Sequence, residues 1–463
     1  MISIWYSILL SALCYNLAFL CPTYCAWAIV FFMPFLFPVF VLDTYQNYRL
    51  PSIFFYGFLW GLITYGINFI WFFKLLCTHA QTSIIGAFVG YSIITCYFAL
   101  GAGLWFLITH QVINLVARNK ITRYISRIIT IITIITTTIV YFFIIDRWFL
   151  IPCGRSEGYP FLNPLIPLAH YSWFLKLCAI ICSLVCDGGL GLQNHSNNNY
   201  TRSRSPRWSE FYERVEGCVT ANSSVTFVYL EPLINKKKGE DKPWASSPYG
   251  VGQEIFHQLS RLHLEQYCDS NKPVIVVAPE STYRFALNLY PDIIDLWATV
   301  LPKNVHLLIG SHKREDKKLL QAVYWIHGSR IINSYVKKHS LPFVEKVPKM
   351  WRSSPWVGDL FLKNIVEFST GKNKRHNKVF CLTPDFYAIP TICSEFFFSR
   401  SIGEFLNYKK SRKKTGAIFL FANDSWFCDY FSKNLELFTR LKSAAIGLPI
   451  VYVTHSNVTV MNI

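Results

Sequence analysis

The chain divides into a strongly apolar first part and a second part in which apolar and polar segments alternate. Up to about residue 187, long apolar runs follow one another with few charged residues between them. A helix needs about 20 apolar residues to cross the hydrocarbon core of a bilayer. We therefore expect a polytopic α-helical membrane domain over residues 1–187. The apolar runs predict about six spanning helices in it, near residues 4–21, 25–42, 53–76, 84–109, 126–150 and 164–186.

A polar segment follows this apolar part. The stretch GGLGLQNHSNNNYTRSRSPRW at 188–208 is rich in Asn, Ser and Arg, a composition typical of loops and linkers. We therefore predict a polar linker at 188–215. The remaining residues, 216–463, are expected to form a second domain.

In the second part, short runs rich in β-branched and aromatic residues alternate with helical segments. This alternation is typical of an α/β domain with buried sheets. The strand-like runs are SSVTFVYLEP, KPVIVVAPES, NVHLLIGSHK, KVFCLTPDFYAIPTICSEF, GAIFLFANDS and LPIVYVTHS. Helices are predicted at about 250–268, 286–299 and 430–446.

The net charge of +18 is carried mainly by the second part. Up to residue 187 the chain has 9 Lys or Arg and 4 Asp or Glu, whereas the remainder has 36 and 23, which leaves an excess of +13. Such an excess suits a surface that lies against anionic lipid, and nucleic acid is the competing partner. The sequence has no helix-turn-helix, zinc-finger or RNA-binding signature, so we expect no nucleic acid partner.

Three residues at predicted strand ends could form a catalytic site. Glu280 ends VIVVAPES, Lys337 lies in SYVKKHSLPFVEKVP, and Cys393 ends IPTICSE. A carboxylate can accept the proton of a thiol as general base, and an ammonium group can stabilise both the thiolate and the oxyanion that follows. Taken one by one, the three have plainer explanations: a helix cap or surface residue, a solvated charge and a core cysteine.

The segments around these residues resemble the nitrilase (carbon–nitrogen hydrolase) superfamily. Within it they are most similar to the bacterial apolipoprotein N-acyltransferases, which are membrane enzymes. The matching motifs are PES at 279–281, YVKKHSLPFVE at 335–345, ICSE at 392–395 and NDSWF at 423–427. In the apolar part, GFLWGLITYGINFIWF at 57–72 and GYPFLNPLIPLA at 158–169 resemble the third span and the loop before the sixth span of that family.

The resemblance implies a role for each motif residue. Glu280 is the expected general base, Lys337 the oxyanion stabiliser and Cys393 the nucleophile, with Glu345 and Glu395 as supporting carboxylates. The implied reaction moves an acyl chain from a phospholipid to Cys393 as a thioester, and then to the α-amino group of the diacylglyceryl-cysteine that begins an apolipoprotein. The implied fold is a nitrilase-like αββα sandwich on a helical membrane platform, with no cofactor and no metal.

The chain departs from the family pattern at several positions. Ser394 replaces the tyrosine that follows the nucleophile, and Val344 replaces a glycine. The sequence ends at Ile463, without the family's last strands and C-terminal membrane helix, and a seventh span before the second domain is absent. We therefore expect a divergent and C-terminally shortened relative.

Two readings of the topology conflict. The loop that contains Arg118, Lys120, Arg123 and Arg127 is predicted to be cytoplasmic by the positive-inside rule, and six spans then place the second domain in the cytoplasm as well. The resemblance instead implies a multi-pass protein of the bacterial inner membrane with a periplasmic catalytic domain, which is the topology we favour.

Two alternatives to the N-acyltransferase function stay open. One is a nitrilase-like membrane amidase or acyltransferase of another pathway, such as conjugal transfer, in which water resolves the thioester. The other is a catalytically decayed paralogue that serves as a membrane scaffold. Retention of Glu280, Lys337 and Cys393 argues against decay, whereas the early end of the chain argues for it.

Overall fold

The structure is a computed structural model, and it divides the chain into two compact units. A helical unit comprises Met1–Tyr171, Val347–Ile365 and Phe427–Phe438, and a sheet unit comprises Ser172–Lys346, Val366–Trp426 and Thr439–Ile463. The structure describes residues 4–20, 49–78, 82–117, 123–148, 166–188, 225–231, 243–267, 273–340, 345, 368–369, 371, 378–384, 386–397, 415–426 and 429–461.

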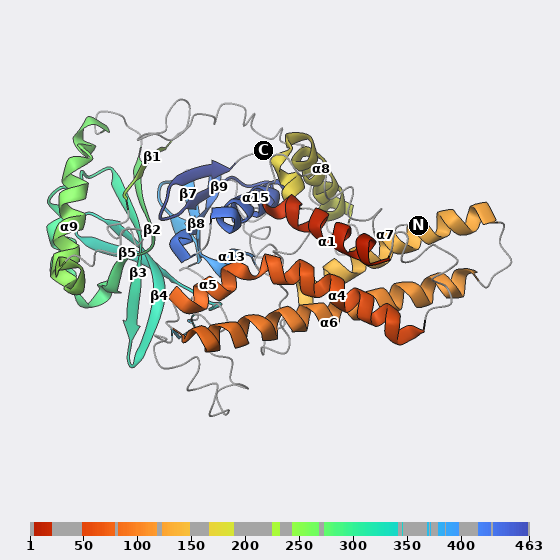
Figure 1. The fold of residues 1–463 in the computed structure, drawn as a ribbon. Helices are drawn as coiled ribbons and strands as arrows, with labels where there is room; N and C mark the ends of the chain where they lie inside the picture. The colour runs from red at the N-terminus through yellow and green to blue at the C-terminus, as the bar shows by residue number, and fades with distance from the viewer. Residues whose placement is uncertain are drawn as a thin grey trace. The chain divides into compact units, whose positions relative to one another are not determined.

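Every predicted span that lies in the described part of the chain contains a helix. The range 53–76 is divided at Phe69 into two helices, and the range 25–42 lies outside the described residues. The helices are α1 (Ile4–Leu20), α4 (Leu50–Asn68), α5 (Ile70–Thr78), α6 (Ile84–Ala117), α7 (Arg123–Trp148) and α8 (Ser172–Gly188), drawn from red to olive in Figure 1.

Small residues and polar links hold the helices of the helical unit together. A Cβ atom added to Gly61 of α4 would lie 2.7 Å from the Cα atom of Ala99 of α6, so glycine is required for this close approach. Asn68 Nδ2 donates a 2.5 Å hydrogen bond to Asn16 Oδ1 and thereby links α4 to α1. Both devices are typical of helices that pack inside a membrane, where water exclusion does not drive association.

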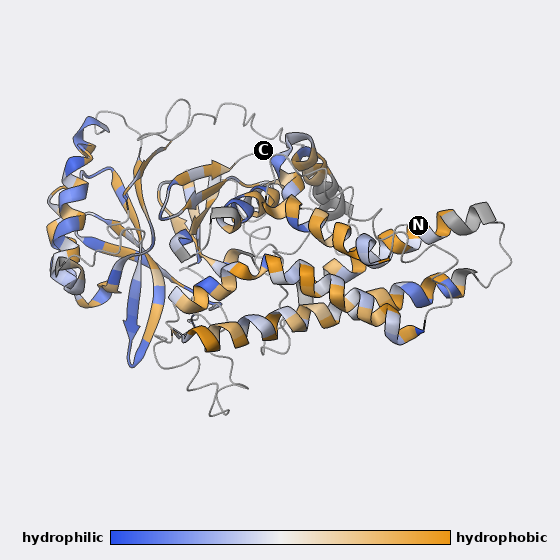
Figure 2. Cartoon of the chain, in the orientation of Figure 1, coloured by the Kyte–Doolittle hydropathy of each residue, from blue (hydrophilic) through white to orange (hydrophobic). Residues whose placement is uncertain are grey.

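Two helices in the described residues are long and apolar enough to cross a membrane. They are Leu50–Asn68 and Ile84–Leu115, whereas the apolar stretches Ile4–Leu20 and Ile128–Phe142 are shorter. Figure 2 shows hydrophobic residues along the lengths of α4 and α6. The count of about six spans stays a prediction, as do the domain limits at 187 and 215.

The sheet unit contains two five-stranded sheets, seen edge-on in Figure 1. The first has the order β1-β2-β3-β4-β5, in which β1, β2 and β3 are parallel and β4 and β5 are antiparallel to their neighbours. Its strands are β1 (Thr226–Tyr229), β2 (Val274–Ala286), β3 (Val305–Glu315), β4 (Lys318–His327) and β5 (Arg330–Val336). The hairpin of β4 and β5 was not among the strands predicted from the sequence.

The second sheet has the order β10-β9-β8-β7-β6, with parallel central strands and an antiparallel strand at each edge. Its strands are β6 (Phe380–Cys381), β7 (Phe386–Ile392), β8 (Thr415–Phe421), β9 (Ile450–Val453) and β10 (Val458–Met461). The predicted strand over 378–396 is thus two strands, and β10 was not predicted.

The two faces of the first sheet have different neighbours, because successive side chains of a strand point to opposite faces. Leu307 and Ile309 of β3 share a core with two helices, α9 (Pro248–Arg261) and α10 (Pro291–Ala298). On the other face, Phe227 and Trp325 lie with their rings 5.8 Å from those of Phe419 and Phe380 in the second sheet. The two sheets therefore pack face to face.

The second sheet also has helical neighbours. Ser443, in the last turns of α15 (Asp429–Ile446), donates a 3.2 Å hydrogen bond to the carbonyl of Met461 on β10. The short helix α13 (Ser394–Phe397) follows β7 directly. In the described residues the layers of this unit are therefore helix, sheet, sheet and helix (Figure 1).

Candidate active site

Glu280 lies on a bulge of β2 that a glycine of β3 makes possible. Residues 279–282 of β2 face a single residue of β3, Gly310, where the register of the two strands shifts. A Cβ atom added to Gly310 would lie 2.2 Å from the carbonyl oxygen of Pro279, so no other residue fits without a shift. Ser281 takes a φ of 58°, which re-aims the backbone directly after Glu280. The bulge therefore turns the carboxylate out of the strand and keeps it 2% exposed.

Cys393 occupies a strained turn at the end of β7. It follows Ile392, the last residue of that strand, and has a φ of 46°, which residues other than glycine rarely adopt. Its backbone N–H donates a 2.7 Å hydrogen bond to the carbonyl of Phe421 on β8, which fixes the turn. Strain of this kind persists only where the surroundings impose it, and it concentrates at functional sites.

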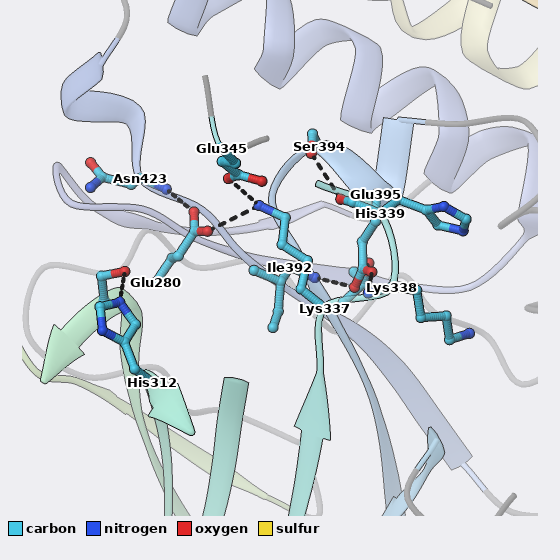
Figure 3. A network of polar contacts seen from close by, with 12 residues as sticks. Glu280, His312, Lys337, Lys338, His339, Glu345, Ile392, Ser394, Glu395 and Asn423 are labelled. Atoms are coloured by element: carbon cyan, nitrogen blue, oxygen red, sulfur yellow. Dashed lines mark hydrogen bonds and ion pairs between the residues drawn. The ribbon is translucent and has the colours of Figure 1, made fainter. Parts of the chain in front are cut away.

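Lys337 lies directly after β5, and its ammonium group joins two carboxylates. Lys337 Nζ lies 3.2 Å from Glu280 Oε1 and 2.6 Å from Glu345 Oε1, as Figure 3 shows. Both contacts are buried, so they are little screened by solvent. Lys337 therefore fixes the position of Glu280.

The carboxylate of Glu280 is at the centre of the site. It lies close enough to the thiol of Cys393 for each group to act on the pKa of the other. Its Oε2 atom accepts a 3.1 Å hydrogen bond from the backbone N–H of Asn423. The backbone carbonyl of Glu280 lies 2.7 Å from His455 Nε2. The three residues predicted to act together thus meet at one point, although they come from β2, β5 and β7.

Glu395 connects the strand ends that carry the other two residues. Its Oε2 atom accepts a hydrogen bond of 2.9 Å from the backbone N–H of Lys338, and its Oε1 atom accepts one of 2.8 Å from that of Ile392. These two N–H groups belong to the neighbours of Lys337 and Cys393 (Figure 3). Glu395 therefore holds the end of β5 against the end of β7 without touching the reacting groups.

Burial and mutual charge shift the pKa values of the three central groups. Burial raises the pKa of Glu280, and the positive charge of Lys337 offsets only part of this rise. Burial raises the pKa of the Cys393 thiol as well, and the negative charge of Glu280 adds to the rise. Burial lowers the pKa of Lys337, but the charges of Glu280 and Glu345 more than compensate, so that its pKa is raised.

These shifts define what the arrangement can do chemically. The Cys393 thiol is neutral at rest, because its pKa is raised, and it lies near a carboxylate whose affinity for protons is increased as well. Lys337 stays charged and lies beside both groups. The site can therefore generate a thiolate during attack on an electrophilic carbon and can place a fixed positive charge beside the oxygen of the resulting intermediate.

The structure brings Glu280, Lys337 and Glu345 into direct contact, and their charges act on the thiol of Cys393. Glu395 is hydrogen-bonded to the residues next to Lys337 and Cys393. Their catalytic roles stay a prediction. The sequence did not predict the role of Asn423, because Asn423 contacts Glu280 through its backbone N–H, which every residue type except proline carries.

The remaining motif positions add one contact. The hydroxyl of Ser394 donates a 3.5 Å hydrogen bond to the carbonyl of His339. Residues 341–344 of the motif lie outside the described residues. Across the described residues, we find no group of three His, Cys, Asp or Glu that could hold a metal ion.

Two curated proteins are similar to this chain. It is 25% identical over 207 residues to the apolipoprotein N-acyltransferase of Allorhizobium ampelinum, which covers 42% of this chain and 36% of that protein. It is 25% identical over 241 residues to the apolipoprotein N-acyltransferase of Sinorhizobium fredii, which covers 50% of this chain and 42% of that protein. The similarity thus spans less than half the length of either relative.

No protein-family model matches the chain. A glutamine-dependent NAD+ synthetase from Acinetobacter baumannii aligns with a TM-score of 0.34 at 12% identity, over 46% of this chain and 39% of that one. XC1258 from Xanthomonas campestris, a CN-hydrolase superfamily protein, aligns with a TM-score of 0.29 at 12% identity, over 45% of this chain and 70% of that one. These scores carry no conclusion about the fold.

Both curated relatives are named apolipoprotein N-acyltransferase.

Proposed function

We propose that the protein is a membrane N-acyltransferase that uses Cys393 as nucleophile. The observation that carries this proposal is a buried thiol beside a buried ion pair: the charges of Glu280 and Lys337 act on Cys393, and Lys337 Nζ lies 3.2 Å from Glu280 Oε1. The similarity to apolipoprotein N-acyltransferases supports a phospholipid as acyl donor and the α-amino group of a diacylglyceryl-cysteine as acceptor.

In the first half of the reaction, Cys393 Sγ attacks the ester carbonyl carbon of a phospholipid. Glu280 accepts the thiol proton as the S–C bond forms, and Lys337 stabilises the negative charge on the carbonyl oxygen. Collapse of this intermediate breaks the C–O bond, and the proton on Glu280 passes to the departing lipid oxygen. The product is an acyl thioester on Cys393 and a lysophospholipid.

In the second half, an amine attacks the thioester and receives the acyl chain. The proton of the amine passes to Glu280 and from there to the departing sulfur, so that the Cys393 thiol is restored. Glu345 and Glu395 act as supporting residues, because they hold Lys337 and the two strand ends in place.

A membrane location suits this chemistry, since both proposed substrates are lipids that reach the thiol along the bilayer. We propose a multi-pass protein of the bacterial inner membrane with its sheet unit in the periplasm. The apolar helices α4 and α6 support membrane insertion, and the resemblance of the motifs supports the orientation.

Mass spectrometry of the purified protein after incubation with phospholipid vesicles tests the proposal. We expect a hydroxylamine-labile acyl adduct on Cys393 in the wild type, and none in Cys393→Ala. An adduct that passes to a diacylglyceryl-cysteine peptide supports the N-acyltransferase function. An adduct that only water removes supports a membrane amidase or acyltransferase of another pathway instead, and a folded wild type without any adduct supports a decayed scaffold.

A further inference from the structure

A row of polar side chains crosses the first sheet beside the candidate active site. Gln321 of β4 is paired with His312 of β3 on one side. On the other side, the backbone N–H of Lys337 donates a 2.9 Å hydrogen bond to the carbonyl of Gln321, which continues the pairing of Ala322 with Val336 by one residue. Directly opposed residues point to the same face, with Cβ atoms about 5 Å apart. Gln321 therefore lies between His312 and Lys337 on one face of the sheet.

This face is the one that carries the catalytic groups. Ala322 and Val336, which precede or follow the row by one residue, belong to the core shared with α9 and α10. Because alternate residues of a strand point to opposite faces, Gln321 and Lys337 point away from those helices and toward the second sheet. The ring contact of Trp325 with Phe380 confirms that this side of β4 meets the second sheet.

Gln321 carries an acceptor that the resting protein does not use. Its Oε1 atom has no hydrogen-bond partner in the part of the chain that the structure describes, and the residue is only 2% exposed. A buried acceptor without a partner destabilises a protein, so nearly all such groups find one. The position of this one, beside Lys337, indicates a partner that arrives with the substrate.

A second acceptor lies at the other end of the row. Ser281, the residue after Glu280, has its Oγ atom 3.4 Å from His312 Nε2. Burial lowers the pKa of His312 to about 4, so the ring is neutral at physiological pH and its Nε2 atom can accept the hydroxyl proton. When the hydroxyl of Ser281 donates to His312, the lone pairs of its Oγ atom remain available to a donor.

We propose that Gln321 Oε1 and Ser281 Oγ bind the N–H groups of the acceptor amine and position its nitrogen for attack on the thioester of Cys393. Two acceptors favour a hydrogen-bond donor such as an amine over a carboxylate or a phosphate, which can only accept. The inference rests on the proposed function and concerns its second half only. Gln321 and Ser281 bind and orient the amine, and His312 acts through Ser281.

The step that they assist is balanced within the site. The amine nitrogen forms a bond to the thioester carbonyl carbon, and the C–S bond breaks. The N–H that Ser281 Oγ has oriented gives its proton to Glu280, which passes it to Cys393 Sγ, while the other N–H stays bonded to the Gln321 carbonyl. The products are an amide and a free thiol.

The test separates the two halves of the reaction. The full chain in detergent is loaded with phospholipid, and the acyl-enzyme is quantified by mass spectrometry before and after addition of a diacylglyceryl-cysteine peptide. In Gln321→Met, which has similar length but no acceptor, we expect transfer to slow at least tenfold and the KM for the peptide to rise, so that acyl-enzyme accumulates. This loss corresponds to about one hydrogen bond to a charged or strongly polar donor. Gln321→Glu keeps an oxygen at this position and is expected to restore much of the transfer.

Two matched variants serve as controls. Gln258 of α9 also has an unpartnered Oε1 atom but belongs to the helix layer, so Gln258→Met should transfer at the wild-type rate. His306 lies on the same face of β3 and also has a pKa of about 4, lowered by burial. His306→Phe should therefore leave transfer unchanged, whereas His312→Phe should slow it.

The outcomes distinguish this inference from the function on which it rests. A wild type that forms no acyl-enzyme overturns both. A wild type that completes both halves, with a Gln321→Met variant of equal transfer rate and equal KM, overturns the inference alone. A Gln321→Met variant that unfolds at a lower temperature and is not restored by Gln321→Glu also overturns it, because the loss is then structural.

Discussion

The thiol of Cys393 lies close enough to the carboxylate of Glu280 for each group to act on the pKa of the other, although the two residues stand on strands of different sheets. Each residue stands where its strand departs from regular geometry, Glu280 on the bulge of β2 and Cys393 in the turn after β7. Their proximity therefore depends on how the two sheets face each other. This proximity also couples the protonation of the two groups, since the charge of Glu280 raises the pKa of the thiol.

Glu280 controls the pH dependence of thioester formation. The carboxylate must be ionised to accept the thiol proton, and its pKa is raised above 4.5 by burial. The rate of acylation should therefore rise with pH along a limb whose midpoint lies above 4.5, and fall as pH drops through the raised pKa. In Glu280→Gln, this pH dependence should disappear, and the acylation rate should fall about 10²- to 10⁴-fold. Single-turnover acylation measured across pH checks the prediction. A midpoint at or below 4.5 would contradict it.

Lys337 balances two buried carboxylates, so its removal should cost stability as well as activity. Lys337→Met leaves Glu280 and Glu345 close together without a cation, and we expect a loss of about 3–5 kcal/mol. The double variant Lys337→Met/Glu345→Gln removes one of the two charges and should recover part of that loss. Unfolding of the four proteins of this cycle in detergent measures the coupling. Strictly additive effects would show that the contacts do not interact.

Gly310 should be required for the position of Glu280. Gly310→Ala places a Cβ atom 2.2 Å from the carbonyl of Pro279, so the bulge must move. We expect a loss of about 1–3 kcal/mol in stability and a larger relative loss in acylation. Gly328→Ala is the matched control. It adds a Cβ atom with nothing within 4 Å at a φ of 56°, and should cost about 1 kcal/mol with acylation unchanged.

Glu395 should affect the catalytic residues through their neighbours. Glu395→Ala leaves the part-buried N–H of Lys338 and the buried N–H of Ile392 without their acceptor, and we expect a loss of about 1–3 kcal/mol in stability for the buried group and less for the other. Glu395→Gln keeps one acceptor oxygen and should be intermediate between wild type and the alanine variant in both stability and acylation rate. Equal rates for the two variants would mean that charge, rather than the two hydrogen bonds, is what matters at this position.

Much of the sheet unit follows from local patterns in the sequence. The runs that end at Glu280 and Cys393 are continuous and apolar, as expected of strands buried on both faces, and β2 and β7 are found there. The hairpin of β4 and β5 was missed because charged residues at 315–318 precede it and polar residues alternate through β5. The sequence signal that could have revealed the hairpin is the glycine at position 328, which forms its turn with a φ of 56°.

The candidate site was predictable only in part, for a different reason. Side chains with their own chemistry, such as Cys393 and Lys337, can be noticed from their type and their motif. Contacts made by backbone groups cannot be noticed in this way. The hydrogen bond from the backbone N–H of Asn423 to Glu280 is such a contact. The position of Gln321 between His312 and Lys337 depends on the register of β3, β4 and β5. That register could not be predicted, because the hairpin of β4 and β5 was not recognised in the sequence.

At Cys393, which has a φ of 46°, the residue that the proposed reaction needs differs from the residue that the backbone conformation favours. Glycine is the residue that this backbone conformation favours, and a cysteine there costs about 1 kcal/mol that a glycine would not. A protein with glycine at position 393 would thus gain backbone stability and lose its nucleophile. Selection for stability alone would therefore favour glycine at position 393 and an inactive protein. A cysteine at this position is expected only if the thiol is needed for a reaction. For the experimentalist, Cys393→Gly is accordingly a better scaffold than Cys393→Ala for capturing an unreacted lipid in place.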